Sequence, residues 1–250
     1  MKVVILCGGK GTRLGSPTEI IPKTLALVSG KPIIWHIMNM YSSYGFNDFI
    51  LPLGFGGDKI KEYFWTYKWK NCDFTKELGS NNVTFFNKPN NWKVTFVDTG
   101  IETMTGGRIK KIKKFIYEDT FMLTYGDGLS DINIGNLLNF HKEKGKAVTV
   151  TGVERKSQYG ILTAKDGIVT TFDEKSKLDG IINGGFFVMN KKVFDYIEDD
   201  NECIFEQEPL RNLVISGELA VYNFKGYWTA IDTNKDLIYA NETWEGVKLT

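Results

Sequence analysis

A short apolar run at the start of the chain ends abruptly in glycine. Val3 to Leu6 are all aliphatic, and Gly8 and Gly9 follow one residue later. An apolar run of this length, bounded by glycine, is typical of a strand that is buried on both faces. The sequence therefore predicts a core strand that leads directly into a glycine-rich turn.

Strand and helix patterns alternate after this turn. Pro32 precedes a segment with helical spacing of apolar residues, and proline suits the first turn of a helix. We expect helices over 33–41, 59–65 and 134–141 and strands over 49–53, 121–125 and 147–152. This order predicts an α/β fold of Rossmann-like type, with a mostly parallel sheet flanked by helices.

Two stretches depart from the alternation. Residues 71–91 are rich in Asn and carry a strand pattern only at 83–86, which predicts a long loop or flap with a small hairpin. Residues 159–187 contain short extended runs broken by glycine, which predict small additional β elements. Nothing in the composition suggests a linker, so we expect residues 1–250 to form a single domain.

The charge balance limits the kinds of partner. The 250 residues include 31 Lys and Arg against 30 Asp and Glu, a formal net charge of +1. Such a balance gives no general attraction to nucleic acid or to an anionic membrane, and the first segment is too short for a membrane span. Cys7, Cys72 and Cys203 lack C-x-x-C spacing, which favours reduced cysteines in a cytoplasmic protein.

The first candidate site is the glycine-rich segment after strand one, which contains Gly8, Gly9, Gly11, Thr12 and Arg13. Glycines let backbone N–H groups turn toward a phosphate, and an Arg guanidinium presents a fork of donors to phosphate oxygens. The spacing is that of neither a P-loop nor a dinucleotide fingerprint. A glycine turn without a ligand is the alternative.

Lys23 is the next candidate. It follows Pro22, whose ring fixes φ and stiffens the segment. An ammonium held in this way can neutralise a phosphate under attack. A solvated surface lysine is the competing interpretation.

Two carboxylates form the candidate metal site. Asp127 lies between two glycines after the apolar strand at 121–125, and ligands of open α/β sheets bind beyond such strand ends. Asp232 also follows an extended run, so we pair it with Asp127 as ligands of Mg²⁺. A helix N-cap is the alternative role for Asp232.

A weaker candidate lies further along the chain. Glu174 and Lys175 follow an extended run, and Asn183 comes soon after. These side chains can hydrogen-bond hydroxyl groups and pair with a phosphate. Charged pairs in β turns are commonplace, so this pattern alone does not decide the role.

The chain resembles the sugar-phosphate nucleotidyltransferases and, among them, the glucose-1-phosphate cytidylyltransferases. The matching segments span nearly the whole chain: GGKGTRL at 8–14, PK at 22–23, GKPIIWHIMNMYSSYG at 30–45, VTFVDTG at 94–100, MTGGRIKK at 104–111, FMLTYGDGLSDI at 121–132, INGGFFVMN at 182–190 and FEQEPL at 205–210. The glycine segment marks the superfamily, and the others are more specific to the cytidylyl branch.

The resemblance implies a nucleotide-diphospho-sugar transferase-like fold and Mg²⁺-dependent coupling of CTP to glucose 1-phosphate, giving CDP-glucose and pyrophosphate. It implies Arg13, Lys23 and Asp127 as catalytic residues, with Asp127 and Asp232 on the metal. The implied nucleotide contacts are Leu6, Gly8, Gly9, Gly11, Thr12, Thr99, Gly100 and Tyr125, and the implied acceptor contacts are Gly160, Glu174, Lys175 and Asn183. It also implies a homo-oligomer, in which residues 71–91 reach a neighbouring subunit.

Three segments differ from the family pattern. Ile21-Pro22-Lys23-Thr24 stands where Lys-Pro-Lys-Pro is usual, Glu174-Lys175-Ser176-Lys177 replaces Glu-Lys-Pro-Lys, and Arg155-Lys156-Ser157-Gln158-Tyr159 is more polar than we expect for a glucose enzyme. The changes around 155–177 leave open a different acceptor, such as another sugar phosphate or a phosphorylated amino acid or amide. A non-catalytic nucleotide-sugar sensor is the alternative of another class, which the complete set of charged residues disfavours.

Overall fold

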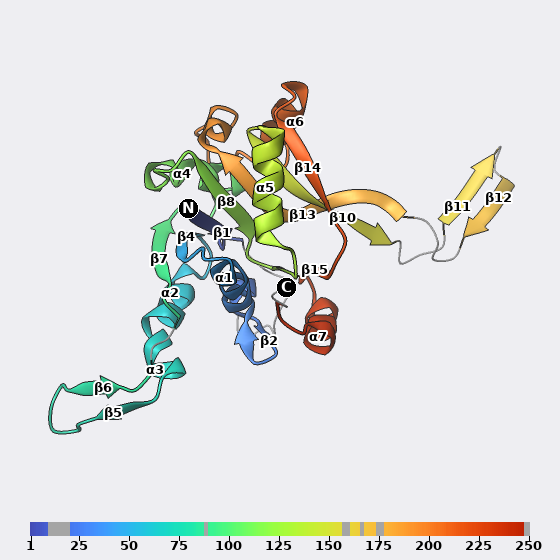
Figure 1. Cartoon of the computed structure of the whole chain (residues 1–250). Helices are drawn as coiled ribbons and strands as arrows, with labels where there is room; N and C mark the ends of the chain where they lie inside the picture. The colour runs from blue at the N-terminus through green and yellow to red at the C-terminus, as the bar shows by residue number, and fades with distance from the viewer. Residues whose placement is uncertain (10–20, 88–89, 157–160, 166–167, 174–177, 248–250) are drawn as a thin grey trace.

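A seven-stranded sheet forms the centre of the computed structural model (Figure 1), which describes residues 1–9, 21–87, 90–156, 161–165, 168–173 and 178–247. The strand order is β14-β10-β13-β8-β1-β4-β7. These strands span β1 Lys2–Leu6, β4 Asp48–Leu53, β7 Lys93–Asp98, β8 Thr120–Tyr125, β10 Val148–Lys156, β13 Leu178–Asn190 and β14 Leu219–Phe224. Only β13 runs antiparallel to its neighbours among these seven, which confirms the mostly parallel Rossmann-like sheet.

The helices cover both faces of the sheet. They are α1 Ile33–Ser43, α2 Gly57–Trp65, α3 Tyr67–Asn71, α4 Thr105–Lys111, α5 Ile134–Lys144, α6 Glu208–Ile215 and α7 Asn234–Thr243, with short 3-10 turns at Lys23–Leu25, Lys113–Phe115 and Lys191–Asp195. The helices predicted over 33–41, 59–65 and 134–141 are therefore present as α1, α2 and α5. The part of the chain that the structure describes holds no helix long and apolar enough to cross a membrane.

Alternation along β1 explains the two-sided core. Val3 and Ile5 pack into a cluster with α1, while Val4 and Leu6 pack into a second cluster with Ile109 of α4. Successive side chains of a strand point to opposite faces, so an all-apolar strand needs cover on both sides. Residues Val3 to Ile5 are fully buried, as the apolar run predicts.

Two β hairpins extend away from the body (Figure 1). One is formed by β5 Phe74–Lys76 and β6 Val83–Phe85, within the stretch predicted to be an excursion. The other is formed by β11 Ile161–Lys165 and β12 Ile168–Asp173. Shorter strands complete the structure: β2 Leu27–Val28, β3 Lys31–Pro32, β9 Gly128–Ser130 and β15 Trp228–Ala230.

Strand order sets the place where a ligand can bind. β4 and β7 lie on one side of β1, and β8 pairs with β1 on the other side. The order in which strands are added to the sheet thus reverses between β1 and β8. The crevice beyond the carboxyl ends of the strands at such a point is the usual ligand site of open α/β sheets. The glycine turn after β1 and Asp127 after β8 both lie at this edge.

Candidate active site

A cavity of about 550 Å³ opens at this edge of the sheet. Its walls come from the end of β1, the Lys23 turn, the segment before α4, the end of β8, β13 and β15. The predicted site residues that line it are Leu6, Gly8, Gly9, Lys23, Tyr125, Asp127, Asn183 and Asp232. Segments more than 200 positions apart in the sequence thus meet around one hollow of nucleotide size.

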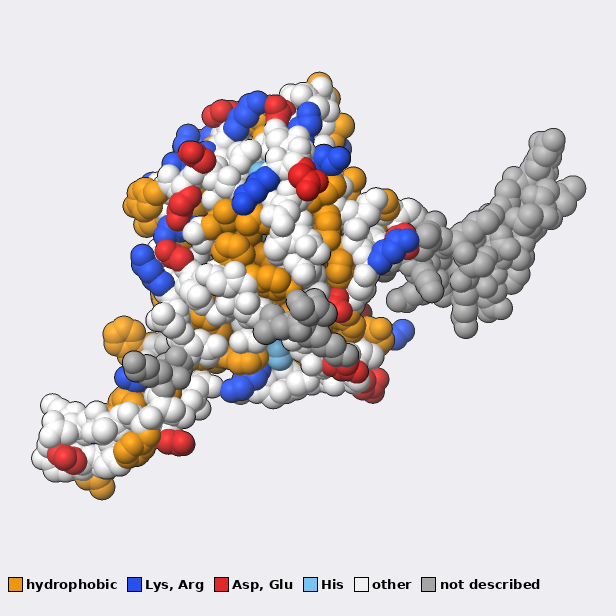
Figure 2. Space-filling view, viewed as in Figure 1, with side chains coloured by type: hydrophobic (Ala, Val, Ile, Leu, Met, Phe, Trp, Pro, Cys, Tyr) orange, Lys and Arg blue, Asp and Glu red, His pale blue; other side chains and the backbone are white. Residues whose placement is uncertain are grey.

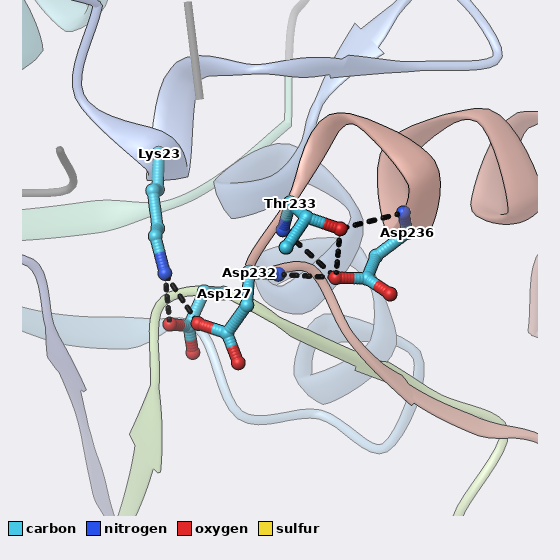
Figure 3. A network of polar contacts seen from close by, with 5 residues as sticks. All are labelled: Lys23, Asp127, Asp232, Thr233 and Asp236. Carbon is cyan, nitrogen blue, oxygen red and sulfur yellow. Dashed lines mark hydrogen bonds and ion pairs between the residues drawn. The ribbon is translucent and has the colours of Figure 1, made fainter. Parts of the chain in front are cut away.

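Three charged groups that line the cavity lie close together (Figure 3). The Lys23 ammonium lies 2.5 Å from Asp232 Oδ1 and 3.6 Å from Asp127 Oδ2. The Lys23 side chain is only 16% exposed, so water screens these ion pairs incompletely. The ammonium and the two carboxylates therefore form a charged cluster in a partly buried cavity.

The pKa of the Asp127 carboxyl is raised above its usual value. Burial raises the pKa of its carboxyl, the Lys23 ammonium opposes this rise, and the nearby Asp232 adds to it. The Asp127 backbone carbonyl accepts the Ile231 N–H at 2.8 Å, which ties the loop after β8 to the segment that carries Asp232. The two carboxylates are therefore positioned together by the backbone.

The structure shows that Asp232 is not the N-cap of the following helix. Thr233, not Asp232, is the N-cap of α7, and its hydroxyl accepts the backbone N–H of Asp236 at 3.3 Å. The Asp236 carboxylate returns the interaction by accepting the Thr233 N–H at 2.8 Å, which completes a capping box. The Asp232 side chain is thereby left to face Lys23 (Figure 3).

Oxygen ligands at the cavity fit a hard divalent cation. Among the described residues, no group of three or more His, Cys, Asp or Glu is arranged to hold a metal ion. Asp127 and Asp232 therefore form a pair of carboxylates, and Mg²⁺ is commonly bound by one or two carboxylates together with water and substrate phosphates. The two residues suit a metal that arrives with a phosphorylated ligand.

Arg108, in α4, is the main structural residue of the site that the sequence did not reveal. Its side chain is buried, and its guanidinium donates to Gly8 O at 2.9 Å, Leu53 O at 3.1 Å and Gly100 O at 2.8 Å. It also donates to Thr99 Oγ1 at 2.6 Å. Arg108 thus ties the glycine turn to the ends of β4 and β7.

This arrangement orients the glycine turn. The Gly8 carbonyl accepts from Arg108 and points into the protein, and across a trans peptide the Gly9 N–H points the opposite way. A Cβ on Gly8 would overlap the Arg108 guanidinium, so glycine is required at this position. The turn can therefore present a backbone donor to the cavity.

Several predicted contacts lie elsewhere. Thr99 is buried behind the cavity wall, where its hydroxyl donates to Leu53 O, and Gly100 accepts from Arg108. Neither residue lines the cavity, and their contact with a nucleotide stays a prediction. Gly11, Thr12, Arg13, Gly160, Glu174 and Lys175 lie outside the described residues.

Comparisons with known proteins identify the family of the chain. The model of the nucleotidyl transferase family matches residues 2–246. A protein of Bacillus subtilis strain 168, named probable glucose-1-phosphate cytidylyltransferase, is 54% identical over 244 residues, covering 98% of this chain and 96% of its own length. The glucose-1-phosphate cytidylyltransferase of Salmonella typhimurium is 44% identical over 248 residues, with 98% and 96% covered.

Solved structures share the fold over the full length. HddC from Yersinia pseudotuberculosis superposes with a TM-score of 0.72 at 27% identity, covering 98% of this chain and 99% of the other. A putative glucose-1-phosphate thymidylyltransferase from Bacillus anthracis gives a TM-score of 0.73 at 17% identity, covering 100% of this chain and 97% of the other, a likeness of fold alone. With the family match and the two close relatives, these findings show that the chain belongs to the nucleotidyl transferase family.

Proposed function

We propose that this chain is a cytidylyltransferase that couples CTP to glucose 1-phosphate, giving CDP-glucose and pyrophosphate. The observation that carries the proposal is the Lys23 ammonium between Asp127 and Asp232, in a cavity at the switch point of the sheet. The names of the two close relatives support the choice of CTP and glucose 1-phosphate. Residues 2–246 match one family model, which supports a single catalytic domain over 1–250.

The nucleophile of this reaction is an anionic phosphate oxygen of the acceptor, which attacks the α-phosphorus of CTP as pyrophosphate leaves. No general base is needed, so the protein contributes positioning and charge neutralisation. Lys23 neutralises the α-phosphate, and Gly8 and Gly9 bind phosphate oxygens through the backbone. Arg13, Gly11 and Thr12, which lie outside the described residues, complete this nucleotide side, with Leu6, Thr99, Gly100 and Tyr125 near the nucleotide.

Asp127 and Asp232 are the proposed ligands of Mg²⁺. When bound, the ion neutralises charge on the phosphate oxygens of the nucleotide. The carboxylates are partly accessible, with 34% of the Asp127 side chain and 51% of the Asp232 side chain exposed, so an ion can reach them. Lys23 must then move from the carboxylates toward the phosphates, because ammonium and metal compete for the same oxygens.

The acceptor side is proposed to consist of Asn183, which lines the cavity, together with Gly160, Glu174 and Lys175, which lie outside the described residues. The sequence changes around 155–177 support a second candidate, a cytidylyltransferase for another phosphorylated acceptor. The chemistry at the α-phosphorus is the same in both cases. The acceptor is therefore the part of the proposal that an assay must decide.

The test is release of pyrophosphate with Mg²⁺, measured for CTP, UTP, dTTP, ATP and GTP against glucose 1-phosphate and a panel of other phosphorylated metabolites. We expect release with CTP and glucose 1-phosphate at ordinary enzyme rates of about 1–10³ s⁻¹. If pyrophosphate is released from CTP only with an acceptor other than glucose 1-phosphate, the protein is still a cytidylyltransferase, but the proposed acceptor is wrong. The absence of release from every pair would favour a nucleotide-sugar sensor.

We propose further that the enzyme is a homo-oligomer of the cytoplasm. The β5–β6 arm carries exposed apolar side chains (Figure 2), including Leu78, which is 95% exposed, and Phe86, which is 69% exposed. Exposed apolar patches of this kind mark contact surfaces. Light scattering on the full chain should give a mass above 28.4 kDa, and Leu78→Asp should lower this mass.

The cysteines support the proposed cytoplasmic location. Cys7, Cys72 and Cys203 are all free thiols, as is usual in the reducing cytoplasm.

A further inference from the structure

Glu206 connects two walls of the cavity. It lies just before α6, and each of its carboxylate oxygens accepts a hydrogen bond from a hydroxyl group. Tyr125 donates to Oε1 at 2.5 Å, and Thr105 donates to Oε2 at 2.6 Å. Tyr125 ends β8, two residues before Asp127, and Thr105 begins α4, so one carboxylate links both elements.

Hydrogen bonds connect Asn183 through Tyr125 and Glu206 to Thr105, and we call this chain of contacts the relay. Backbone N–H groups fix which group donates in each of these bonds. The Gly185 N–H donates to Asn183 Oδ1 at 2.8 Å, so the Asn183 amide nitrogen faces the other way and donates to the Tyr125 hydroxyl at 3.3 Å. The Phe205 N–H donates to Thr105 Oγ1 at 2.9 Å. Each hydroxyl therefore accepts on one side and must donate to Glu206 on the other.

Packing keeps Tyr125 and Asn183 together. Gly185 has φ +80°, and a Cβ there would lie 2.5 Å from the Tyr125 ring, so the ring rests directly on the backbone of β13. The Trp228 indole N–H donates to Gly184 O at 2.7 Å and holds the other side of this segment. The orientation of Tyr125 thus sets the orientation of the amide beside it.

We propose that Glu206 is a positioning residue for the acceptor, which acts through Tyr125 on the Asn183 amide. The relay uses one lone pair of the Asn183 oxygen and one of its two side-chain N–H bonds. The second N–H is left to donate to an oxygen of the substrate, either a hydroxyl or a phosphate oxygen. This inference rests on the proposed function of the cavity, in which Asn183 contacts the acceptor.

The kinetic test is a double-mutant cycle of Glu206→Gln and Tyr125→Phe, with Glu208→Gln as the matched control. Glu208 is exposed and forms a salt bridge with Arg211, so its variant reports the loss of a charge from the same segment. We expect each single variant to raise KM for glucose 1-phosphate about tenfold, the size of one hydrogen bond to a charged group. Glu206→Gln, at a residue that does not line the cavity, should raise KM for CTP less than twofold. The double variant should be no worse than either single variant, because both cut one relay.

A purely structural role gives a different result. If Glu206 only clamped its loop to α4, KM for CTP would rise with KM for the acceptor, or the two effects would multiply to about a hundredfold. Either outcome overturns the proposal. A thermal melt of each variant separates loss of folded protein from loss of positioning.

A second readout does not depend on turnover. The side-chain amide of Asn183, assigned by its loss in Asn183→Asp, should shift in the NMR spectra of both Glu206→Gln and Tyr125→Phe and stay in place in Glu208→Gln. An unchanged signal in Glu206→Gln would refute the relay. If the wild-type enzyme failed to turn over CTP and glucose 1-phosphate, the proposed function would fail, while this signal would still decide the relay.

Discussion

Lys23 Nζ and Asp232 Oδ1 lie 2.5 Å apart although 209 positions separate the two residues in the chain. The contact joins the turn after the glycine-rich segment to the loop before α7. Because Lys23 also lies 3.6 Å from Asp127 Oδ2, one ammonium balances both proposed metal ligands. This arrangement makes Lys23 the residue whose removal is most informative.

Lys23→Met should lower kcat by about 10²- to 10³-fold, as expected for the loss of one well-placed electrostatic group in a transition state. The side chain keeps most of its length and loses its ammonium group. Steady-state release of pyrophosphate measures the effect, with Lys192→Met as a control for loss of a surface lysine that pairs with Glu218. A decrease of less than tenfold would make Lys23 a structural ion-pair partner.

The same variant should bind a divalent ion more tightly in the absence of nucleotide. Two carboxylates without their ammonium attract a cation more strongly, and a nearby charge contributes on the order of 1 kcal/mol or more near a protein surface. Electron paramagnetic resonance with Mn²⁺ should show affinity about tenfold higher in Lys23→Met than in the wild type. Unchanged affinity would mean that Lys23 and the metal do not compete for Asp127 and Asp232.

Arg108→Met should destabilise the fold by about 3 kcal/mol. The variant leaves several buried carbonyl oxygens, including Gly8 O and Leu53 O, without their donor, and each such loss costs about 1–3 kcal/mol before relaxation. Urea unfolding measures the change. Arg211→Met, which removes an exposed i,i+3 ion pair with Glu208, should cost no more than about 0.5 kcal/mol. Equal losses in both variants would contradict the structural role of Arg108.

Much of this architecture was predictable because its causes are local. The all-apolar β1, the proline before α1 and the glycines after β1 each act within a few residues, and the corresponding elements are present. The sequence leaves Asp232 between two roles, since an Asp before a helix is also a common N-cap. The structure excludes the N-cap role because Thr233 and Asp236 form the cap, and the role as a metal ligand stays a prediction.

The contacts of Arg108 and Glu206 could not be predicted in this way. Arg108 stands in a helix with two further basic residues, Lys110 and Lys111, which is the pattern of an exposed helix. Its acceptors come from three separate parts of the chain, at residues 8, 53 and 99–101. The one local clue is the pair Gly106 and Gly107, because a Cβ at either would press against the backbone of residues 200–203. The sequence could thus have indicated close packing of α4, but not the partner of the guanidinium.

Stability should decrease as the pH falls below about 6.5. Burial lowers the pKa of His36 and His141 from the usual value of 6.5, so the unfolded chain binds protons that the folded chain does not. The neutral form is favoured at His36, because Val28 O accepts at Nε2 and the Trp244 indole donates to Nδ1. Stability is therefore complete above the unfolded pKa and is lost as the pH falls toward the lower folded pKa.

Each histidine can contribute a slope of up to about 1.4 kcal/mol per pH unit in this window. Urea unfolding of the wild type between pH 7.5 and 5.5 should show the decrease, and His36→Gln or His141→Gln should flatten it even if the variant is less stable at pH 7.5. A wild-type stability that stays constant or rises toward pH 5.5 would show that these imidazoles are not held neutral.

The most direct test of the central claim is ³¹P NMR of CTP, glucose 1-phosphate and Mg²⁺ with the wild-type enzyme and with Asp127→Asn. We predict that the wild type forms a diphosphate diester and free pyrophosphate in equal amounts, and that the variant remains folded and forms neither. Formation of CMP, of CDP with a bisphosphorylated sugar, or of full product by Asp127→Asn would contradict the proposed transfer at the α-phosphorus in this cavity.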